Sequence, residues 1–189
     1  LRIIPHLLLM APKDENELHD MLKFAADYQD GPVSIRYPRG SGTAKRLRKG
    51  YKPIELAKAE VLAGGDAATI LAVGEMVPEA MKAQKILARK NIEVEIINMR
   101  FISPLDTVTL DRVQKKGAPI FTVEENSVAG GFGAGVMEYY SCTNTGVAEV
   151  TPVGIPHEFA CQATRRKLIE KYGLDGSSIA EKVLKGLQS

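Results

Sequence analysis

Two short apolar runs, separated by a helical pattern, occupy the first forty residues of the chain. Residues 7–11 and 33–37 have the length and apolar character of β-strands. Asp14 and Glu17 have the spacing of a capping box, which predicts the start of a helix between the two strands. Apolar residues then follow on one helical face: Leu18, Met21, Leu22 and Ala25. This β-α-β unit is too small to bury its apolar faces alone, so we expect it to pack against another part of the protein.

From residue 57 onward, strand and helix patterns alternate. Residues 60–62 and 69–73 flank Gly64-Gly65-Asp66 and are predicted to form a hairpin. The remaining predicted elements are a helix from Pro78 to Asn91, a strand at 94–97, a helix from Pro104 to Lys116, a strand at 120–123, a helix at 132–140, a strand at 147–153, and helices at 160–172 and 176–187 separated by Gly173. Such alternation predicts an α/β fold with three layers, α/β/α. The sheet should be mostly parallel, with the first hairpin strand antiparallel at an edge.

A stretch of different character joins these two parts. Residues 41–56 are rich in Lys, Arg and Gly and poor in apolar side chains, which is typical of a solvated linker. The same basic residues could also contact phosphate. We therefore divide the chain into residues 1–42, 43–56 and 57–189. Because the chain begins at Leu1 rather than at methionine and soon enters a strand, we expect residues 1–42 to be the incomplete end of a second α/β domain.

Composition argues against several classes of partner. The 189 residues are 44% apolar and 25% charged, with a formal net charge of +2, as in an ordinary globular protein. This charge is too small to favour nucleic acid, and the apolar run at residues 7–10 is too short to span a membrane. No signal-peptide pattern is present, so the cytoplasm is the expected location.

The cysteines and histidines do not form a recognisable site. Cys142 and Cys161 lack the spacing of a redox or metal motif, which favours reduced thiols in structural positions. His6, His19 and His157 have no acid or cysteine at ligand spacing. The sequence therefore predicts no metal site.

The strongest candidate for chemistry is residues 34–40, Ser-Ile-Arg-Tyr-Pro-Arg-Gly, which we call the arginine turn. Arg36 and Arg39 carry permanent charge and planar donor groups that suit phosphate or carboxylate. Pro38 fixes the turn, and Gly40 lets the backbone approach a ligand closely. The alternative is a strand end whose arginines pair with neighbouring acids.

Three further segments carry polar or glycine-rich patterns. Residues 130–135 precede a helix, but their glycines do not match a dinucleotide fingerprint or a P-loop, which favours close packing of the helix entry over phosphate binding. Glu124-Glu125-Asn126 follows a predicted strand, where the acids could orient a ligand, a cation or another subunit, or could cap a helix or turn. Arg100 is a candidate for an ion pair or an interface, and Asp106 for a helix N-cap.

Five motifs follow one another along nearly the whole chain. They are Asp14-Glu15-Asn16-Glu17, Ile35-Arg36-Tyr37-Pro38-Arg39-Gly40, Val73-Gly74-Glu75-Met76, Asn98-Met99-Arg100-Phe101 with Pro104-Leu105-Asp106, and Val123-Glu124-Glu125-Asn126 with Gly130-Gly131. In order and spacing these motifs resemble the carboxyl-terminal third of the 1-deoxy-D-xylulose-5-phosphate synthase family of transketolase-like enzymes. The resemblance implies that residues 1–42 end a pyrimidine-binding domain and that residues 57–189 form a transketolase carboxyl-terminal domain.

The resemblance also implies a reaction. Enzymes of this family use thiamine diphosphate and Mg²⁺ to condense pyruvate with D-glyceraldehyde 3-phosphate, releasing CO₂, for isoprenoid, thiamine and pyridoxal biosynthesis. Arg39 matches the arginine that binds the acceptor's phosphate, and Arg36 would support the structure. Catalytic, cofactor and metal residues lie upstream in the family, so none is expected in this chain, which would bind no cofactor and be inactive alone. The whole enzyme would be a homodimer in the cytoplasm, or in the plastid of a plant.

Two alternatives remain open at this point. A β subunit of a 2-oxo acid dehydrogenase would share the fold and cofactor, and a non-catalytic dimerisation module would use the glycine loop and the Glu124-Glu125 pair at a subunit contact. The chain departs from the family near its end, where His157 and Gln162 replace an acid and a histidine. The roles of Glu124, Glu125, His157 and Gln162 are therefore not assigned from the sequence.

Overall fold

The computed structural model describes residues 1–39, 47–143 and 149–188, and it contains two sheets. The smaller sheet begins with β1 (Leu8–Met10), which pairs in parallel with β2 (Val33–Ile35) across helix α1 (Glu15–Asp27). Its third strand, β6 (Phe101–Ser103), comes from far along the chain and pairs with β1 in the antiparallel sense. The β-α-β unit predicted at the start of the chain is therefore present, and it is extended by a strand that the sequence did not predict.

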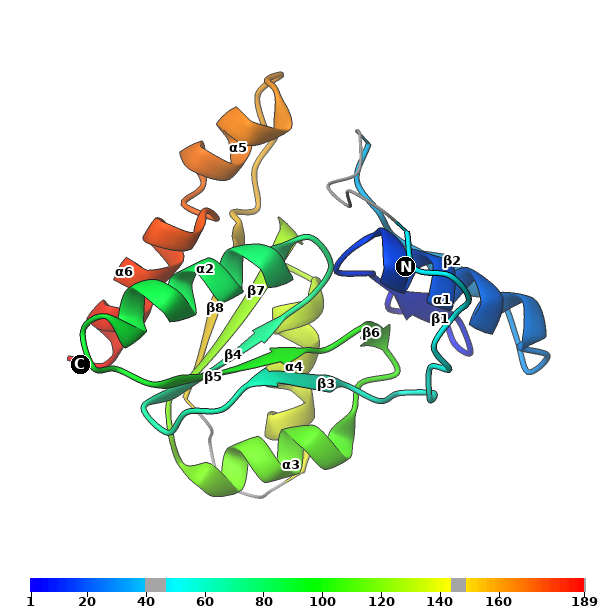
Figure 1. Cartoon of the computed structure of the whole chain (residues 1–189), viewed down its shortest axis with the longest axis horizontal. Helices are drawn as coiled ribbons and strands as arrows, with labels where there is room; N and C mark the ends of the chain where they lie inside the picture. The colour runs from blue at the N-terminus through cyan, green and yellow to red at the C-terminus, as the bar shows by residue number, and fades with distance from the viewer. Residues whose placement is uncertain (40–46, 144–148, 189) are drawn as a thin grey trace.

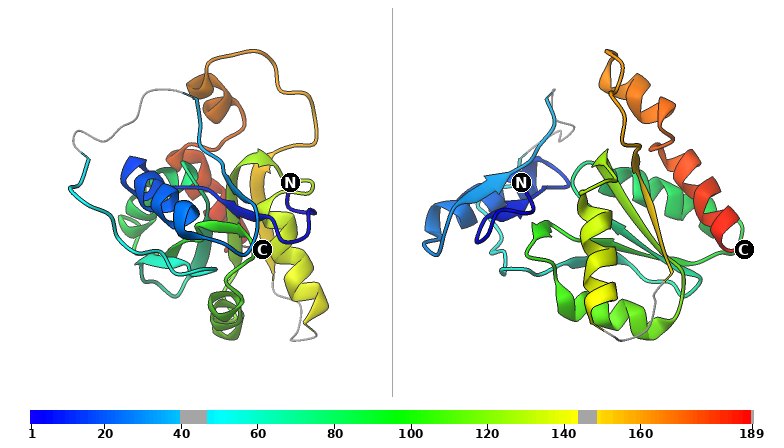
Figure 2. Two further views of the ribbon diagram at one scale, coloured as in Figure 1. Left: turned by 90° about the vertical axis from the view of Figure 1, so that its right-hand side faces the viewer. Right: turned by 180° about the vertical axis from the view of Figure 1, so that it is seen from behind.

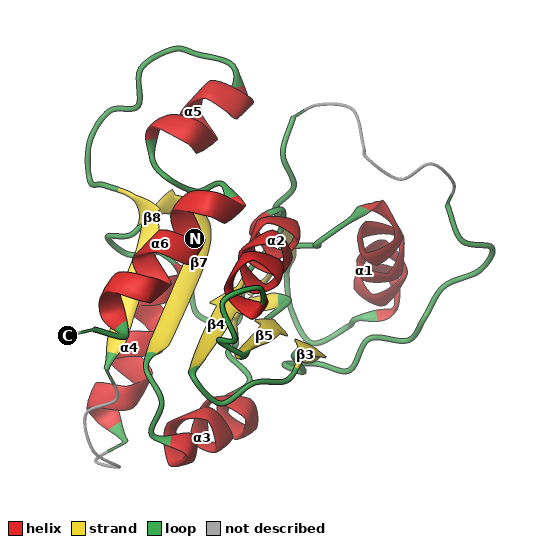
Figure 3. Ribbon diagram, turned by 60° about the vertical axis from the view of Figure 1, so that its left-hand side comes forward, coloured by secondary structure: helices red, strands yellow, loops and turns green. Residues whose placement is uncertain are grey.

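The larger sheet has five strands in the order β3-β5-β4-β7-β8, which Figure 3 shows side by side. Their bounds are β3 Glu60–Ala63, β4 Ala68–Ala72, β5 Val94–Asn98, β7 Ile120–Ser127 and β8 Val150–Ile155. β3 is antiparallel to β5 at the edge, and the other pairs are parallel. This arrangement confirms the predicted mostly parallel sheet with an antiparallel edge strand.

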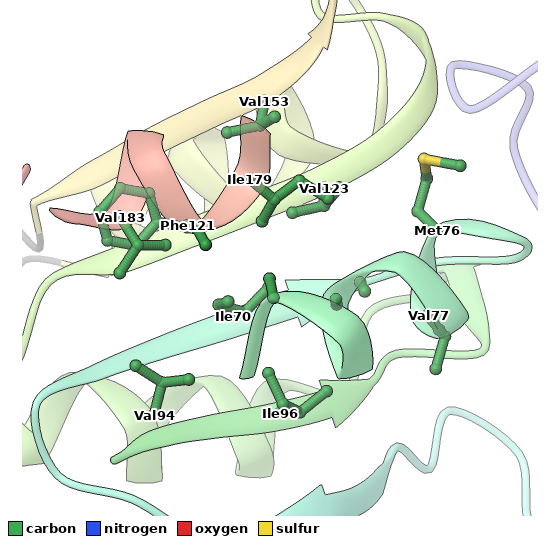
Figure 4. Close-up of a cluster of buried hydrophobic side chains, with 14 of the residues drawn as sticks. Ile70, Met76, Val77, Val94, Ile96, Phe121, Val123, Val153, Ile179 and Val183 are labelled. Atoms are coloured by element: carbon green, nitrogen blue, oxygen red, sulfur yellow. The ribbon is translucent and has the colours of Figure 1, made fainter. Parts of the chain in front are cut away.

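Helices cover both faces of the larger sheet (Figure 1). Those on one face are α2 (Met76–Ala88), α5 (Arg165–Lys171) and α6 (Gly176–Gly186), and those on the other are α3 (Thr107–Lys116) and α4 (Phe132–Cys142). The first layer packs on apolar side chains such as Ile70, Ile96 and Phe121, which meet Val77 and Val183 from the helices (Figure 4). The three-layer α/β/α prediction is confirmed.

The smaller unit stands beside this domain (Figure 2) and contacts it through β1. Leu8 and Met10 face α1 in a small core with Met21 and Phe101, whereas Leu9 packs into the core beneath α3 and α4. Since successive strand residues point to opposite faces, one strand serves two cores. No helix in the described part of the chain is long and apolar enough to cross a membrane.

The predicted hairpin between residues 60–62 and 69–73 is wrong. β3 pairs with β5, not with β4, and β4 lies between β5 and β7. All five residues of β4 are buried, so this strand occupies the centre of the sheet and is paired in parallel on both sides. Gly65 lies against the backbone of Glu93 and Val94 at the start of β5, and a Cβ on Gly65 would come within 2.5 Å of these backbone atoms. The chain therefore crosses the start of β5 between β3 and β4 and does not form a hairpin turn.

Other element boundaries differ less. The helix predicted at 160–172 begins at Arg165, and the strand predicted at 120–123 continues to Ser127. Leu22, predicted on the apolar face of α1, is 54% exposed, while Met21 is buried. The strand predicted at 147–153 is present as Val150–Ile155, and residues 147 and 148 lie outside the described part of the chain.

Candidate anion-binding site

The arginine turn lies at the carboxyl end of β2, close to the carboxyl ends of two strands of the larger sheet. Glu75 follows β4, and Glu125 belongs to the last part of β7. Together with Arg36, Tyr37 and Pro38, these acids line a cavity of about 170 Å³. Carboxyl ends of parallel strands are where open α/β sheets place their ligands, so the cavity is in a suitable position for binding.

Arg36 spans the gap between the two sheets. Its Nη1 donates a hydrogen bond to the backbone oxygen of Glu125 at 3.0 Å. Burial lowers the pKa of the guanidinium, although the carboxylates of Glu125 and Glu124 oppose this effect. Arg36 also lines a second cavity, of about 480 Å³, together with Glu124 and Asn126. Arg36 is thus a partly buried charge that ties the turn to the end of β7.

Arg39 differs from Arg36 in its surroundings. Its side chain is exposed, and no hydrogen bond or ion pair joins it to another described residue. Gly40, the last residue of the predicted turn, lies outside the described residues, as do Gly42, Lys45 and Arg46 of the basic run. Among the described residues, the guanidinium donors of Arg39 at the end of β2 therefore have no acceptor.

Glu125 is engaged by an arginine from the carboxyl-terminal helices. Nε of Arg165 lies 2.8 Å from Oε1 of Glu125, and Nη2 lies 2.5 Å from Oε2, which is a two-pronged pair. Burial acts to lower the pKa of Arg165, but the hydrogen bond and charge of Glu125, together with the charges of Glu75 and Glu79, raise that pKa overall. At Glu75, burial raises the pKa of the carboxyl, with Arg165 opposing. Of the two acids that line the cavity, Glu125 is therefore ion-paired with Arg165, and Glu75 gains a proton more readily than an exposed glutamate.

The glycine-rich segment before α4 binds a carboxylate of the protein itself. Glu124, only 2% exposed, accepts hydrogen bonds from the backbone N–H groups of Phe132 and Gly133, both at 2.8 Å. Burial raises the pKa of Glu124, although these two N–H groups oppose it. A Cβ on Gly131 would overlap the Glu124 carboxylate, and one on Gly133 would overlap Thr122. Close packing of the helix entry, with Glu124 as its cap, is therefore confirmed.

Arg100 and Asp106 occupy places that fit a structural role. Asp106 caps α3, accepting the N–H of Thr109 at 2.9 Å, and Arg100 forms ion pairs with Glu17 and Glu60. Both predictions are confirmed. The three histidines, His6, His19 and His157, are exposed. Cys142 and Cys161 are free thiols, but both are exposed, so the predicted structural positions of the two cysteines are wrong.

Sequence reasoning missed Arg165 and Glu75 as members of the site. Arg165 is 40 residues away from Glu125, and nothing in its neighbourhood marks it among adjacent basic residues. Glu75 had a signal, because it follows a buried strand as Glu125 does. The position of an acid after a parallel strand could have identified it.

Comparison with known proteins defines the class of this chain. Residues 57–179 match the model of the transketolase C-terminal domain. The chain belongs to the transketolase C-terminal domain family.

Among curated proteins the chain is similar to 1-deoxy-D-xylulose-5-phosphate synthases. It is 44% identical to that of Pelotomaculum thermopropionicum over 97% of the chain, and 41% identical to that of Desulforudis audaxviator over 92%. These matches confirm the resemblance predicted from the sequence motifs. The chain spans only 29% and 27% of the length of these two relatives.

Solved structures support the same fold. A protein described as "Split gene transketolase, inactive beta4 tetramer" superposes with a TM-score of 0.84 at 29% identity, covering 99% of this chain and 59% of the other. The transketolase of Leishmania mexicana gives a TM-score of 0.74 at 20% identity, covering 100% of this chain and 26% of the other. The second likeness concerns the fold alone.

A thiamine diphosphate and Mg²⁺ site does not fit the part of the chain described here. Within residues 1–39, 47–143 and 149–188, no group of three or more His, Cys, Asp or Glu side chains could hold a metal ion. The backbone N–H groups at the glycine-rich entry of α4 already bind Glu124. Neither feature of the described residues suits a metal-bound diphosphate.

Proposed function

We propose that this chain is the carboxyl-terminal part of a 1-deoxy-D-xylulose-5-phosphate synthase. The whole enzyme would join pyruvate to D-glyceraldehyde 3-phosphate with loss of CO₂, supplying isoprenoid, thiamine and pyridoxal biosynthesis. Thiamine diphosphate and Mg²⁺ would be held by the other domains of the same enzyme, acting as a homodimer in the cytoplasm or a plastid. The similarity to synthases over nearly the whole chain supports this proposal.

Within that enzyme, Arg39 would bind the phosphate of the acceptor. The observation that carries this role is the contrast between the arginines around the cavity. Arg36 is held by the Glu125 backbone and Arg165 by the Glu125 carboxylate, whereas Arg39 has no partner among the described residues. An exposed guanidinium at a strand end can form charge-assisted hydrogen bonds with phosphate.

The test is Arg39→Ala in the full-length enzyme. We expect its affinity for glyceraldehyde 3-phosphate to fall by about 1.5–3 kcal/mol, the usual contribution of a hydrogen bond to a charged group. Affinity for pyruvate should stay the same, because pyruvate carries no phosphate. Arg166→Ala is a suitable control, since Arg166 is exposed and, among the described residues, pairs with Glu170 of its own helix. Unchanged affinity for glyceraldehyde 3-phosphate in Arg39→Ala would contradict the proposed role.

The same preparation distinguishes the enzyme classes. We expect the full-length protein to condense pyruvate with glyceraldehyde 3-phosphate and not to acylate a lipoyl domain. The opposite result would identify a β subunit of a 2-oxo acid dehydrogenase. Absence of both activities in the folded full-length protein would favour a dimerisation module.

A further inference from the structure

A second polar cluster lies where the smaller unit meets the larger sheet, and its centre is Glu17. This carboxylate is 3% exposed and stands in the first turn of α1. Its two oxygens accept hydrogen bonds from Nδ2 of Asn98 at 2.9 and 3.0 Å, and Oε1 also accepts one from Nε of Arg100 at 2.7 Å. A side chain of the smaller unit is thus bound at the end of β5 in the larger domain.

Two further charged groups complete the set, which we call the interdomain cluster: Lys13, Glu17, Glu60, Asn98 and Arg100. Nζ of Lys13 lies 3.2 Å from Oε1 of Glu17 and 2.6 Å from Oε2 of Glu60. Nη2 of Arg100 lies 3.1 Å from the same Glu60 oxygen. Two cations face two carboxylates, so the cluster is neutral as a whole.

The local helix-start pattern does not account for Glu17. In a capping box, the third helical residue bonds back to the N–H of the N-cap residue. Here Asp14 does accept the N–H of Glu17 at 2.8 Å, but Glu17 accepts the N–H of Lys13, at 2.7 Å. The remaining bonds of its carboxylate are directed across the boundary, which gives this residue a function beyond starting α1.

A short series of hydrogen bonds joins this cluster to the arginine turn. Arg100 has a left-handed backbone, with φ of 55°, and its backbone oxygen accepts the N–H of Ala11 at 2.9 Å. The adjacent Met10 accepts the N–H of Arg36 at 2.8 Å. Only the end of β1 therefore separates Arg100 from Arg36. A left-handed conformation is disfavoured for arginine, so surrounding contacts are needed to maintain it, and the Glu17 pair provides one.

We propose that Glu17, Asn98 and Arg100 are positioning residues that hold the arginine turn at a fixed place relative to the larger sheet. The proposal rests on the proposed function, because the consequence of this placement is phosphate recognition by Arg39. Buried ion pairs add little net stability compared with apolar packing, and in some proteins they specify the arrangement of the groups that carry them. Displacement of a binding group by about 1 Å is enough to lower a reaction rate strongly.

A matched control is available on the same strand as Asn98. Glu95 of β5 is also 3% exposed and also ion-paired, with Arg112 at 2.8 Å and Lys116 at 3.3 Å. All of these partners belong to the larger domain. Glu17→Gln and Glu95→Gln therefore make the same chemical change at similar burial, and only the first weakens contacts across the boundary.

The first readout is the ratio of kcat/KM for glyceraldehyde 3-phosphate to kcat/KM for unphosphorylated D-glyceraldehyde in the full-length enzyme. We expect Glu17→Gln to lower this ratio roughly tenfold, mainly through KM for the phosphorylated acceptor. Glu95→Gln should leave the ratio unchanged, even where it lowers thermal stability. Arg100→Lys, which keeps the charge and loses the shared guanidinium contacts, should lower the ratio in the same direction and serves if Glu17→Gln does not fold.

The second readout, which does not depend on activity, is amide hydrogen exchange of the peptide covering residues 33–39. Exchange should be faster in Glu17→Gln and Arg100→Lys than in Glu95→Gln. Unchanged exchange in folded Glu17→Gln and Arg100→Lys would overturn the proposal, as would faster exchange with an unchanged ratio. If Arg39→Ala itself leaves the ratio unchanged, phosphate binding at Arg39 is wrong, and exchange alone then decides whether the cluster positions the turn.

Discussion

The carboxylate of Asp106 connects the start of α3 to the residue before β3. It accepts N–H groups from Thr109 at 2.9 Å and from Ala59 at 2.8 Å, and it is 3% exposed. Asp175 caps α6 with N–H groups of its own helix only, from Ser177 and Ser178. Asp106 thus caps a helix and also binds a distant backbone segment, whereas the hydrogen bonds from Ser177 and Ser178 to Asp175 come from α6.

We expect Asp106→Ala to lower the free energy of unfolding by about 1–3 kcal/mol, more than Asp175→Ala, because it removes a cap and also leaves a distant N–H without its acceptor. Burial acts to raise the pKa of Asp106, but hydrogen bonds from Ala59 and Thr109 outweigh it and lower that pKa. The stabilisation is therefore complete above the unfolded pKa, about 3.9, and is lost as the pH falls through the lower folded value. Urea unfolding of wild type and both variants from neutral to acidic pH measures the free energy of unfolding. If the difference between wild type and Asp106→Ala were the same at acidic pH as at neutral pH, the prediction would be contradicted.

Single residues were predictable where their partners are close in sequence. The caps at Asp14 and Asp106 follow from spacings of three residues, because each accepts the N–H of the third residue onward. The Arg165–Glu125 pair spans 40 residues, and only the three-dimensional fold brings its members together. For the arginine turn, the sequence indicated the anion-binding chemistry of its arginines but not that Glu75 and Glu125 lie beside it.

At the level of elements, the entry of α4 depends on the absence of a side chain at Gly133. Alanine is normally the better helix former by about 1 kcal/mol. At this position, however, a Cβ would overlap Oγ1 of Thr122 on β7. The requirement is therefore close contact between helix and strand, not backbone flexibility.

We expect Gly133→Ala to lower the free energy of unfolding by about 1–3 kcal/mol, as overpacking does elsewhere. Gly64→Ala is the matched control, because a Cβ there would meet nothing within 4 Å. Thermal unfolding of the two variants gives the comparison. Equal stability of Gly133→Ala and wild type would show that α4 can move away from β7 without cost.

Elements were predicted well where periodicity is strong, and pairing was predicted poorly. The patterns identified α2 and α4 because their apolar positions recur at helical spacing. The turn signal at Gly64-Gly65-Asp66 is local, whereas the partner of β3 is decided by which strand is buried on both sides. β6 was missed because three residues are too few for a periodic signal.

At the level of the whole molecule, the proposed function makes the described residues one part of a larger active centre, because the chain spans only 29% and 27% of the length of two synthase relatives. In the proposed synthase the arginine turn would provide charge for the acceptor's phosphate, and the described residues contain no group of three or more His, Cys, Asp or Glu side chains that could hold a metal ion. We expect the isolated chain to give no thiamine-dependent condensation of pyruvate with glyceraldehyde 3-phosphate. The assay should be repeated with a polypeptide supplying the remaining domains of the synthase, which should restore turnover. Turnover by the 189 residues alone would contradict this prediction.

The linker predicted at residues 43–56 divides the sequence at a different place from the boundary between the two sheets. β6 lies beyond the linker, yet it pairs with β1, and Arg100 just before it pairs with Glu17. Exchange of whole domains between related genes at this linker would therefore separate β1 from its partner strand β6, and Glu17 from its ion-pair partner Arg100. A chimaera joined at the linker would need β1 and Glu17 from the same parent as β6 and Arg100. These two segments are therefore expected to be inherited together.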